Sequence, residues 1–182
     1  MPEDRPGMSS PVAIVDVQYE ADHARAACVV AAGWTDGTSL EERVTSISDV
    51  RPYKPGAFYE RELPCLLAVL ALVRTPVHTI VVDGYVDLDE QGAPGLGAHL
   101  HTHLGGAVSI LGVAKTSFRG SSFATPVLRG ESKTPLFVTA RGLSASDAAH
   151  LVRHMHGPHR IPTLLRRVDM LARGRARPIE ET

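Results

Sequence analysis

The chain of 182 residues predicts an α/β fold: a mixed β-sheet, with an antiparallel meander of three strands followed by parallel strands, flanked by α-helices. Three observations predict this fold class. Three strand-like segments near the start of the chain are separated only by short turns, apolar strands then alternate with helical segments, and two helical segments lie near the end. Strands first, then helices alternating with strands, are typical of a mixed sheet covered by helices.

The first half of the chain begins with three segments of strand composition, 12–20, 24–34 and 40–48. The stretches between them, "ADH" and "TDGTS", are short and turn-like, so we expect neighbouring strands to pair antiparallel. A helix is expected over 63–73, because a helix tolerates proline only in its first turn and Pro64 would lie there.

The second half alternates buried strands with helical segments. The β-branched run "VHTIVVDG", 77–84, predicts a short strand buried on both faces. A Gly- and Asp-rich loop follows, and then a short helix or turn near 99–104. The remaining elements that we expect are strands at 107–115, 123–130 and 134–140, a helix at 144–156 that Ser144 caps, and a helix at 160–174.

The composition, 43% hydrophobic and 21% charged, indicates a globular chain of one domain. We expect a disordered segment at 1–10, a single domain at 11–175 and a C-terminal tail at 176–182. The polar, proline-containing start does not resemble a signal peptide, and no apolar stretch is long enough to span a membrane. Cys28 and Cys65 lie in apolar runs and form no disulfide framework, so we expect a cytoplasmic protein.

The formal net charge of -1 argues against a basic field over the whole molecule. The C-terminal part is nevertheless locally basic, with seven arginines from Arg153 to Arg177 and one acid, Asp169. Three histidines of this part are expected to contact phosphate or solvent: His154, His156 and His159.

Three carboxylates stand where chemistry could need them, although each has a simpler explanation. Asp16 lies within the apolar run "VAIVDVQY", where it could face outward from a one-sided sheet. Asp83 ends a buried strand, at the position where α/β sheets bind ligands, but Asp-Gly turns are common. Glu62 opens the predicted helix, where the helix dipole alone would favour it.

Taken together, the three carboxylates predict a site for a hard divalent cation. Magnesium prefers oxygen ligands and keeps waters for chemistry, which suits phosphodiester hydrolysis. Lys115 ends another buried strand, "GVAK", and could neutralise charge on a phosphate or extend into water. Histidines at alternate positions in "HLHTH" suggest zinc instead, but the surrounding sequence does not resemble a strand and cysteine ligands are absent nearby.

Six motifs in order resemble the endonuclease V family, deoxyinosine-specific nucleases with a ribonuclease H-like fold. They extend from about Val12 to Asp169 and read "VDVQY", "PYKPGAFYERELP", "VVDG", "GLGAHL", "GVAK" and "GPHRIPTLLRRVD". The resemblance implies an endonuclease, acting as a monomer, that nicks DNA or RNA at the second phosphodiester 3′ to inosine. It implies magnesium as the cofactor, with manganese able to substitute.

The resemblance also implies a role for individual residues. Asp16, Glu62 and Asp83 match the metal-binding carboxylates, and Lys115 matches a lysine near the scissile phosphate. The matched sets are the wedge that opens the duplex (Pro52, Tyr53, Lys54 and Pro55), the base pocket (Gly56, Phe58, Gly84 and Leu96), and candidate contacts to the nucleic-acid backbone (His99, Arg141 and Arg160). A flipped base costs a few kcal/mol of stacking, which a rigid turn carrying Tyr53 can offset.

The chain departs from the family pattern at three positions. Arg141 stands where the family has histidine, Asp89 lies near another expected histidine in a slightly longer loop, and Lys54 replaces an apolar wedge residue. Arginine is always charged and cannot ligate a cation. These departures motivate two alternatives: a catalytically impaired relative that binds nucleic acid, or a metal hydrolase of another phosphate ester.

Overall fold

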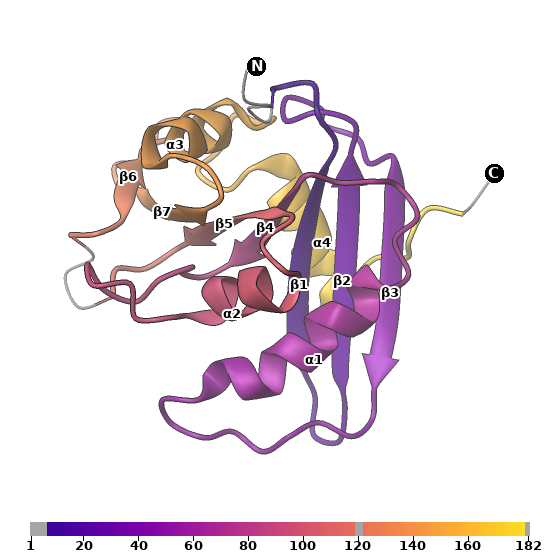
Figure 1. The fold of residues 1–182 in the computed structure, drawn as a ribbon. Helices are drawn as coiled ribbons and strands as arrows, with labels where there is room; N and C mark the ends of the chain where they lie inside the picture. The colour runs from indigo at the N-terminus through magenta and orange to yellow at the C-terminus, as the bar shows by residue number, and fades with distance from the viewer. Residues whose placement is uncertain (1–6, 119–121, 181–182) are drawn as a thin grey trace.

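The structure, a computed structural model, describes residues 7–118 and 122–180. It contains one mixed sheet with helices on both faces (Figure 1). The strands are β1 (Val12–Tyr19), β2 (Ala24–Ala31), β3 (Glu41–Ile47), β4 (Thr79–Asp83), β5 (Ser109–Ala114), β6 (Thr125–Val127) and β7 (Leu136–Arg141). The helices are α1 (Phe58–Leu70), α2 (Leu96–His103), α3 (Ala145–His154) and α4 (Thr163–Ala172).

The strand order in the 7-stranded sheet is β3-β2-β1-β4-β5-β7-β6. β1, β2 and β3 pair antiparallel, and β4 and β5 run parallel to β1, which confirms the predicted meander and parallel strands. β7 then pairs antiparallel with both β5 and β6. The carboxyl ends of β1, β4 and β5 therefore meet at one edge of the sheet.

Each face of the sheet has its own core. Val12 and Ile14 point to the face that α3 and α4 cover, whereas Ala13 and Val15 point to the face of α1 and α2. Figure 1 shows the two pairs of helices on opposite sides of the sheet. Because successive side chains of a strand alternate between faces, a strand apolar on both faces must be covered on both.

Helix α1 corrects the sequence prediction, because it begins at Phe58 rather than at 63. Pro64 therefore lies inside the helix instead of in its first turn. Burial of an apolar stripe that includes Leu66 and Val69 offsets the backbone hydrogen bond that proline cannot make. Glu62 consequently lies within α1, and the prediction that it opens the helix is wrong.

The other boundaries differ by a few residues. The strand expected at 123–130 is only Thr125–Val127, and the helix expected at 160–174 begins at Thr163, after Pro162. The segment near 99–104 is a helix, Leu96–His103. The cap of α3 is confirmed, since the Ser144 hydroxyl accepts a hydrogen bond from the backbone N–H of Asp147.

Both ends of the described chain are tied to the domain. Residues 1–6 of the segment expected to be disordered lie outside the described residues, and the Met8 carbonyl accepts a hydrogen bond from the N–H of Trp34 at 2.8 Å. The Ile179 N–H donates to Glu42 at 2.9 Å. The domain limits at 11 and 175 stay a prediction.

Cys28 and Cys65 are free and buried. Among the helices of the described residues, none combines the length and the apolar character that a membrane span requires.

Candidate functional site

Asp16 and Asp83 lie side by side at the carboxyl edge of the sheet. Val15 pairs with Val82 in the parallel register of β1 and β4, so the next residue of each strand is an aspartate. Both face the α4 side and line a small cavity with Asp169 of α4. Asp16 is buried, with 6% of its surface exposed, whereas Asp83 reaches solvent.

Glu62 approaches the same edge from the opposite face of the sheet. It comes from α1, is only 7% exposed, and lines a cavity that also contains Asp83. Asp16, Glu62, Asp83 and Asp169 are called the acidic site below.

The carboxylates of the acidic site repel one another. Burial raises the pKa of Glu62 to about 8, and the charges of Asp16 and Asp83 contribute in the same direction. Burial also raises the pKa of Asp16 to about 6, again with help from Asp83. Asp83 and Asp169 have ion pairs with Lys115 and Arg173, but within the described residues no side-chain cation forms an ion pair with Asp16 or Glu62.

The chemistry of this donor set fits a hard divalent cation. Magnesium takes oxygen ligands, and bringing several carboxylates together is costly unless a cation shares them. In the described ranges no group of three or more His, Cys, Asp or Glu side chains is close enough to hold a metal ion in this structure. Convergence of Asp16, Glu62 and Asp83 on one ion therefore stays a prediction.

Asp169 is the carboxylate that the sequence reasoning missed. In the sequence it stands out only as the single acid of the basic C-terminal part. Packing of α4 against β1 brings it to the cavity of Asp16, and its charge contributes to the raised pKa of Asp16. An isolated acid among seven arginines was the available signal, although nothing local indicates its partner.

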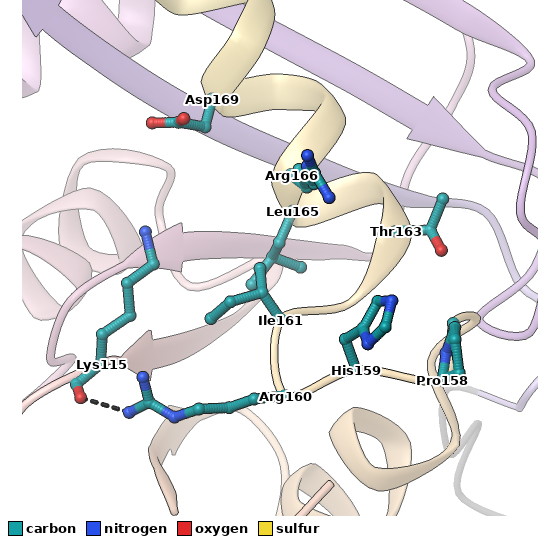
Figure 2. Close-up of a pocket in the computed structure, with 10 residues that line it drawn as sticks. Lys115, Pro158, His159, Arg160, Ile161, Thr163, Leu165, Arg166 and Asp169 are labelled. Carbon is teal, nitrogen blue, oxygen red and sulfur yellow. Dashed lines mark hydrogen bonds between the residues drawn. The ribbon is translucent and has the colours of Figure 1, made fainter. Parts of the chain in front are cut away.

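Lys115 follows β5 and adds a positive charge to the acidic site. Its Nζ lies 3.3 Å from Oδ2 of Asp83. The Arg160 guanidinium donates to the backbone carbonyls of Lys115, Thr134 and Pro135, which fixes the backbone that carries Lys115. Figure 2 shows the bond to Lys115. The predicted contact of Arg160 with nucleic acid stays a prediction, and its position on these carbonyls was not foreseen.

All four residues predicted for the base pocket line one cavity of about 280 Å³. They are Gly56, Phe58, Gly84 and Leu96. Glu62 and Asp83 of the acidic site line the same cavity, and aromatic rings complete its walls: those of Tyr59, Tyr85 and Phe118. The structure thus brings the predicted pocket and two predicted metal ligands to one hollow.

The predicted wedge, Pro52–Pro55, is an exposed turn just before α1. Tyr53 is 59% exposed, and its ring meets the ring of Phe58 edge to face at a centroid distance of 6.1 Å. Lys54 Nζ lies 3.9 Å from Oε2 of Glu60, so the departure at Lys54 comes with a nearby opposite charge. The turn therefore adjoins the cavity, since Phe58 contacts Tyr53 of the turn and also lines the cavity.

Arg141 does not reach the acidic site. Its guanidinium forms an ion pair of 2.7 Å with Asp87 and thereby holds the loop that follows Gly84. His99 stacks on Tyr59 with 3.5 Å between ring centroids, and burial together with the charge of Arg141 lowers its pKa. Contacts of His99 and Arg141 with a nucleic-acid backbone stay predictions.

The histidines of "HLHTH" lie on helix α2 rather than on a strand. On a helix, His99 and His103, four residues apart, share a face but His101 points elsewhere, so the three histidines do not form one set of ligands. This geometry argues against the zinc alternative.

Fold and site together define an α/β enzyme with a ribonuclease H-like sheet and an acidic site at the carboxyl edge of its parallel strands. A family model for endonuclease V matches residues 2–143. Endonuclease V of Streptomyces avermitilis is 32% identical to this chain over an alignment of 186 residues, gaps included. The alignment covers 87% of this chain and 77% of that protein. The chain belongs to the endonuclease V family, a family of nucleases.

Solved structures agree on the fold. The crystal structure of Streptomyces avermitilis endonuclease V has a TM-score of 0.76 and 29% identity, covering 94% of this chain and 83% of that one. Ciona intestinalis endonuclease V, in complex with a 24mer DNA containing an inosine followed by a ribo-adenosine, has a TM-score of 0.77 and 19% identity, covering 91% and 85%. At 19% identity, the similarity to the Ciona intestinalis protein is one of fold.

Proposed function

We propose that this chain is a divalent-metal-dependent endonuclease that nicks DNA or RNA at the second phosphodiester 3′ to an inosine. The observation that carries the proposal is the shared cavity. The four base-pocket residues line it together with Glu62 and Asp83, so a base held there would place its own strand at the acidic site.

Asp16, Glu62 and Asp83 would hold the ion, and Asp169 adds a fourth carboxylate beside Asp16. A bound magnesium ion, for which manganese can substitute, supplies a Lewis acid at the phosphate and lowers the pKa of a bound water. The Lys115 ammonium is free to turn from Asp83 to a phosphate oxygen, where it would neutralise developing charge.

The cavity suits a flipped purine base. Tyr59 and Phe118 offer aromatic surface for stacking, and Tyr53 on the adjoining turn can fill the gap that the base leaves.

Hypoxanthine carries an acceptor at the six position, where adenine carries a donor. The N–H groups of Gly97 and Ala98 at the start of α2 donate to the carbonyls of Tyr85 and Val86. Among the described residues the N–H of Leu96, the first residue of α2, has no such partner, so it is the backbone donor that this wall offers to a base.

A nicking assay tests the proposal. Single- and double-stranded oligonucleotides with one inosine, in DNA and in RNA, are incubated with magnesium, with manganese or with EDTA. We expect one nick, at the second phosphodiester 3′ to inosine, only with metal. Matched strands with adenosine in place of inosine should stay intact.

Two variants separate site chemistry from general charge loss. Glu62→Gln should abolish nicking, whereas Asp147→Asn, on the exposed start of α3, should nick like the wild type. Nicking in EDTA, or undiminished nicking by Glu62→Gln, would contradict the proposal. Tight inosine binding without nicking would favour the alternative of an impaired binding relative.

A further inference from the structure

A second cavity, of about 630 Å³, lies on the α4 side of the acidic site (Figure 2). It is called the α4 groove here. The residues of its wall that matter below are Lys115, His159, Ile161, Leu165, Arg166 and Asp169. Figure 2 shows Lys115 on one side of the groove and α4, with Arg166 and Asp169, on the other.

The α4 groove has a basic rim and an apolar floor. Arg166 and His159 are exposed on the rim, while Ile161 and Leu165 lie between them and Lys115. Neither Arg166 nor His159 has a side-chain partner within the described part of the chain. The one acid of the wall, Asp169, is already paired with Arg173 at 2.8 Å. Cations above apolar surface suit phosphates and the sugars and bases between them.

The α4 groove continues the path that begins at the base cavity. The base cavity contains Asp83, and a small cavity next to it joins Asp83 to Lys115 and Asp169. Those last two residues also line the α4 groove. A strand whose base is held beside Glu62 and whose phosphate reaches Lys115 therefore passes into the α4 groove.

We propose that the α4 groove binds the part of the nucleic-acid strand that lies 3′ to the cut. Arg166 contacts a phosphate beyond the scissile one, His159 contacts the next, and the floor of Ile161 and Leu165 packs against the intervening nucleotide. This inference rests on the proposed function, which fixes the direction of the strand. The groove is built mainly from residues after 143, beyond the part that the family model matches.

The test measures binding in EDTA, where a metal-dependent enzyme cannot cut. Fluorescence anisotropy gives the Kd of inosine single strands carrying one, two, four or six nucleotides 3′ to the cut position. For the wild type we expect Kd to fall about fivefold to tenfold between one and four nucleotides and then to level off, as one or two phosphate contacts would produce. Arg166→Gln should lose most of that gain and bind the shortest strand as the wild type does.

The matched control is Arg153→Gln, which removes an exposed arginine of α3 outside the groove wall. It should keep the dependence on length. The slope of log Kd against log salt on the longest strand should decrease by about 0.7 in Arg166→Gln only, the value for one phosphate of a single strand. His159→Ala provides a second groove variant, and thermal melts verify that all variants are folded.

The outcomes distinguish this inference from the proposed function. If the wild type nicks inosine strands but binds strands of all lengths equally, the proposed role of the α4 groove is wrong and the proposed function is unaffected. A wild type whose binding grows with length but that never nicks supports the groove and overturns the function. Equal weakening of all lengths by Arg166→Gln, or no binding of any strand by the wild type, overturns the groove.

Discussion

Two groups of carboxylates in this chain have opposite electrostatics. At the start of β3, Glu41 accepts hydrogen bonds from Arg43 at 2.8 Å and from the hydroxyl of Thr75 at 2.6 Å. Glu42 forms a two-bond ion pair with Arg167 at 2.8 and 2.9 Å. Burial acts to raise the pKa of both carboxyl groups, but these hydrogen-bond donors outweigh it. They lower the pKa of Glu41 to about 2 and also lower the pKa of Glu42. Glu41 and Glu42 are called the clasp below.

In the acidic site, burial and like charges raise the pKa of Asp16 and Glu62 instead. Glu42 is as buried as Asp16 and Glu62, so burial alone does not explain the difference. Both carboxylates of the clasp are paired with arginines of the same chain, whereas Asp16 and Glu62 of the acidic site have no such partner among the described residues. The contrast supports the proposal that the acidic site holds a cation from outside the chain, whereas the clasp serves the fold.

The largest expected effect is on catalysis. Asp16→Asn should reduce single-turnover nicking of an inosine oligonucleotide by roughly 10³-fold, because it removes charge where the metal would be held. The isosteric amide preserves packing, so the melting temperature in EDTA should not fall. Retained nicking within tenfold of the wild type would place Asp16 with the clasp rather than with a metal site.

Substitutions in the clasp should change the stability of the protein rather than its nicking activity. Glu42→Gln should lower the free energy of unfolding by about 3 kcal/mol, because it breaks a buried ion pair and leaves Arg167 without its charge partner. Chemical denaturation measures this loss. The folded fraction should nick at the wild-type rate, and a selective loss of kcat with unchanged stability would contradict this assignment.

Added metal should stabilise the folded protein through the acidic site and not through the clasp. At about 100 times its Kd, magnesium or manganese should add about 2.7 kcal/mol of stability, which raises the melting temperature by roughly 5–10 °C. Asp16→Asn should lose most of this increase and Glu41→Gln should keep it. Equal metal responses in both variants would mean that the ion binds elsewhere.

The smallest effect is on the pH dependence of stability without metal. Glu62 has a folded pKa of about 8 against 4.5 for the model compound, so its favourable contribution is complete below about pH 4.5 and is lost as pH rises through 8. Glu41 has a folded pKa of about 2, so its contribution is present above about pH 4.5 and is lost as pH falls through 2.

Melting temperatures in EDTA between pH 2 and 9 measure both trends. Glu62→Gln should flatten the decline on the alkaline side by a few degrees, about 1 kcal/mol or more for a domain of this size, and Glu41→Gln should flatten the decline on the acid side. If the melting temperatures of the wild type and of Glu62→Gln agree above pH 6, charge repulsion in the acidic site does not lower the stability of the fold.

Much of the fold follows from local pattern. The β-branched and apolar runs of β1, β4 and β5 predicted strands, and Ser144 predicted the start of α3, because side-chain period and capping act over a few residues. Pro64 misled the prediction for α1, because tertiary burial of Leu66 and Val69 offset a local penalty. Helix boundaries depend on such a balance more than helix existence does.

The candidate site was only partly accessible to sequence. Asp83 at a strand end and the quoted motifs pointed to the cavity that Gly84, Leu96 and Glu62 line. The positions of Asp169 beside Asp16 and of Arg160 on the carbonyl of Lys115 could not be predicted, since each depends on how α4 and the loop before it pack.

The sequence by itself determined which segments are strands, which carboxylates stand at their ends, and to which family the order of motifs points. Only the tertiary structure decided which carboxylates are neutralised. Glu41 and Asp16 both lie in strands, yet one has donors from distant segments and the other faces further carboxylates. The physical reason is that charge interactions act through space, and the neighbours that set them are distant along the chain.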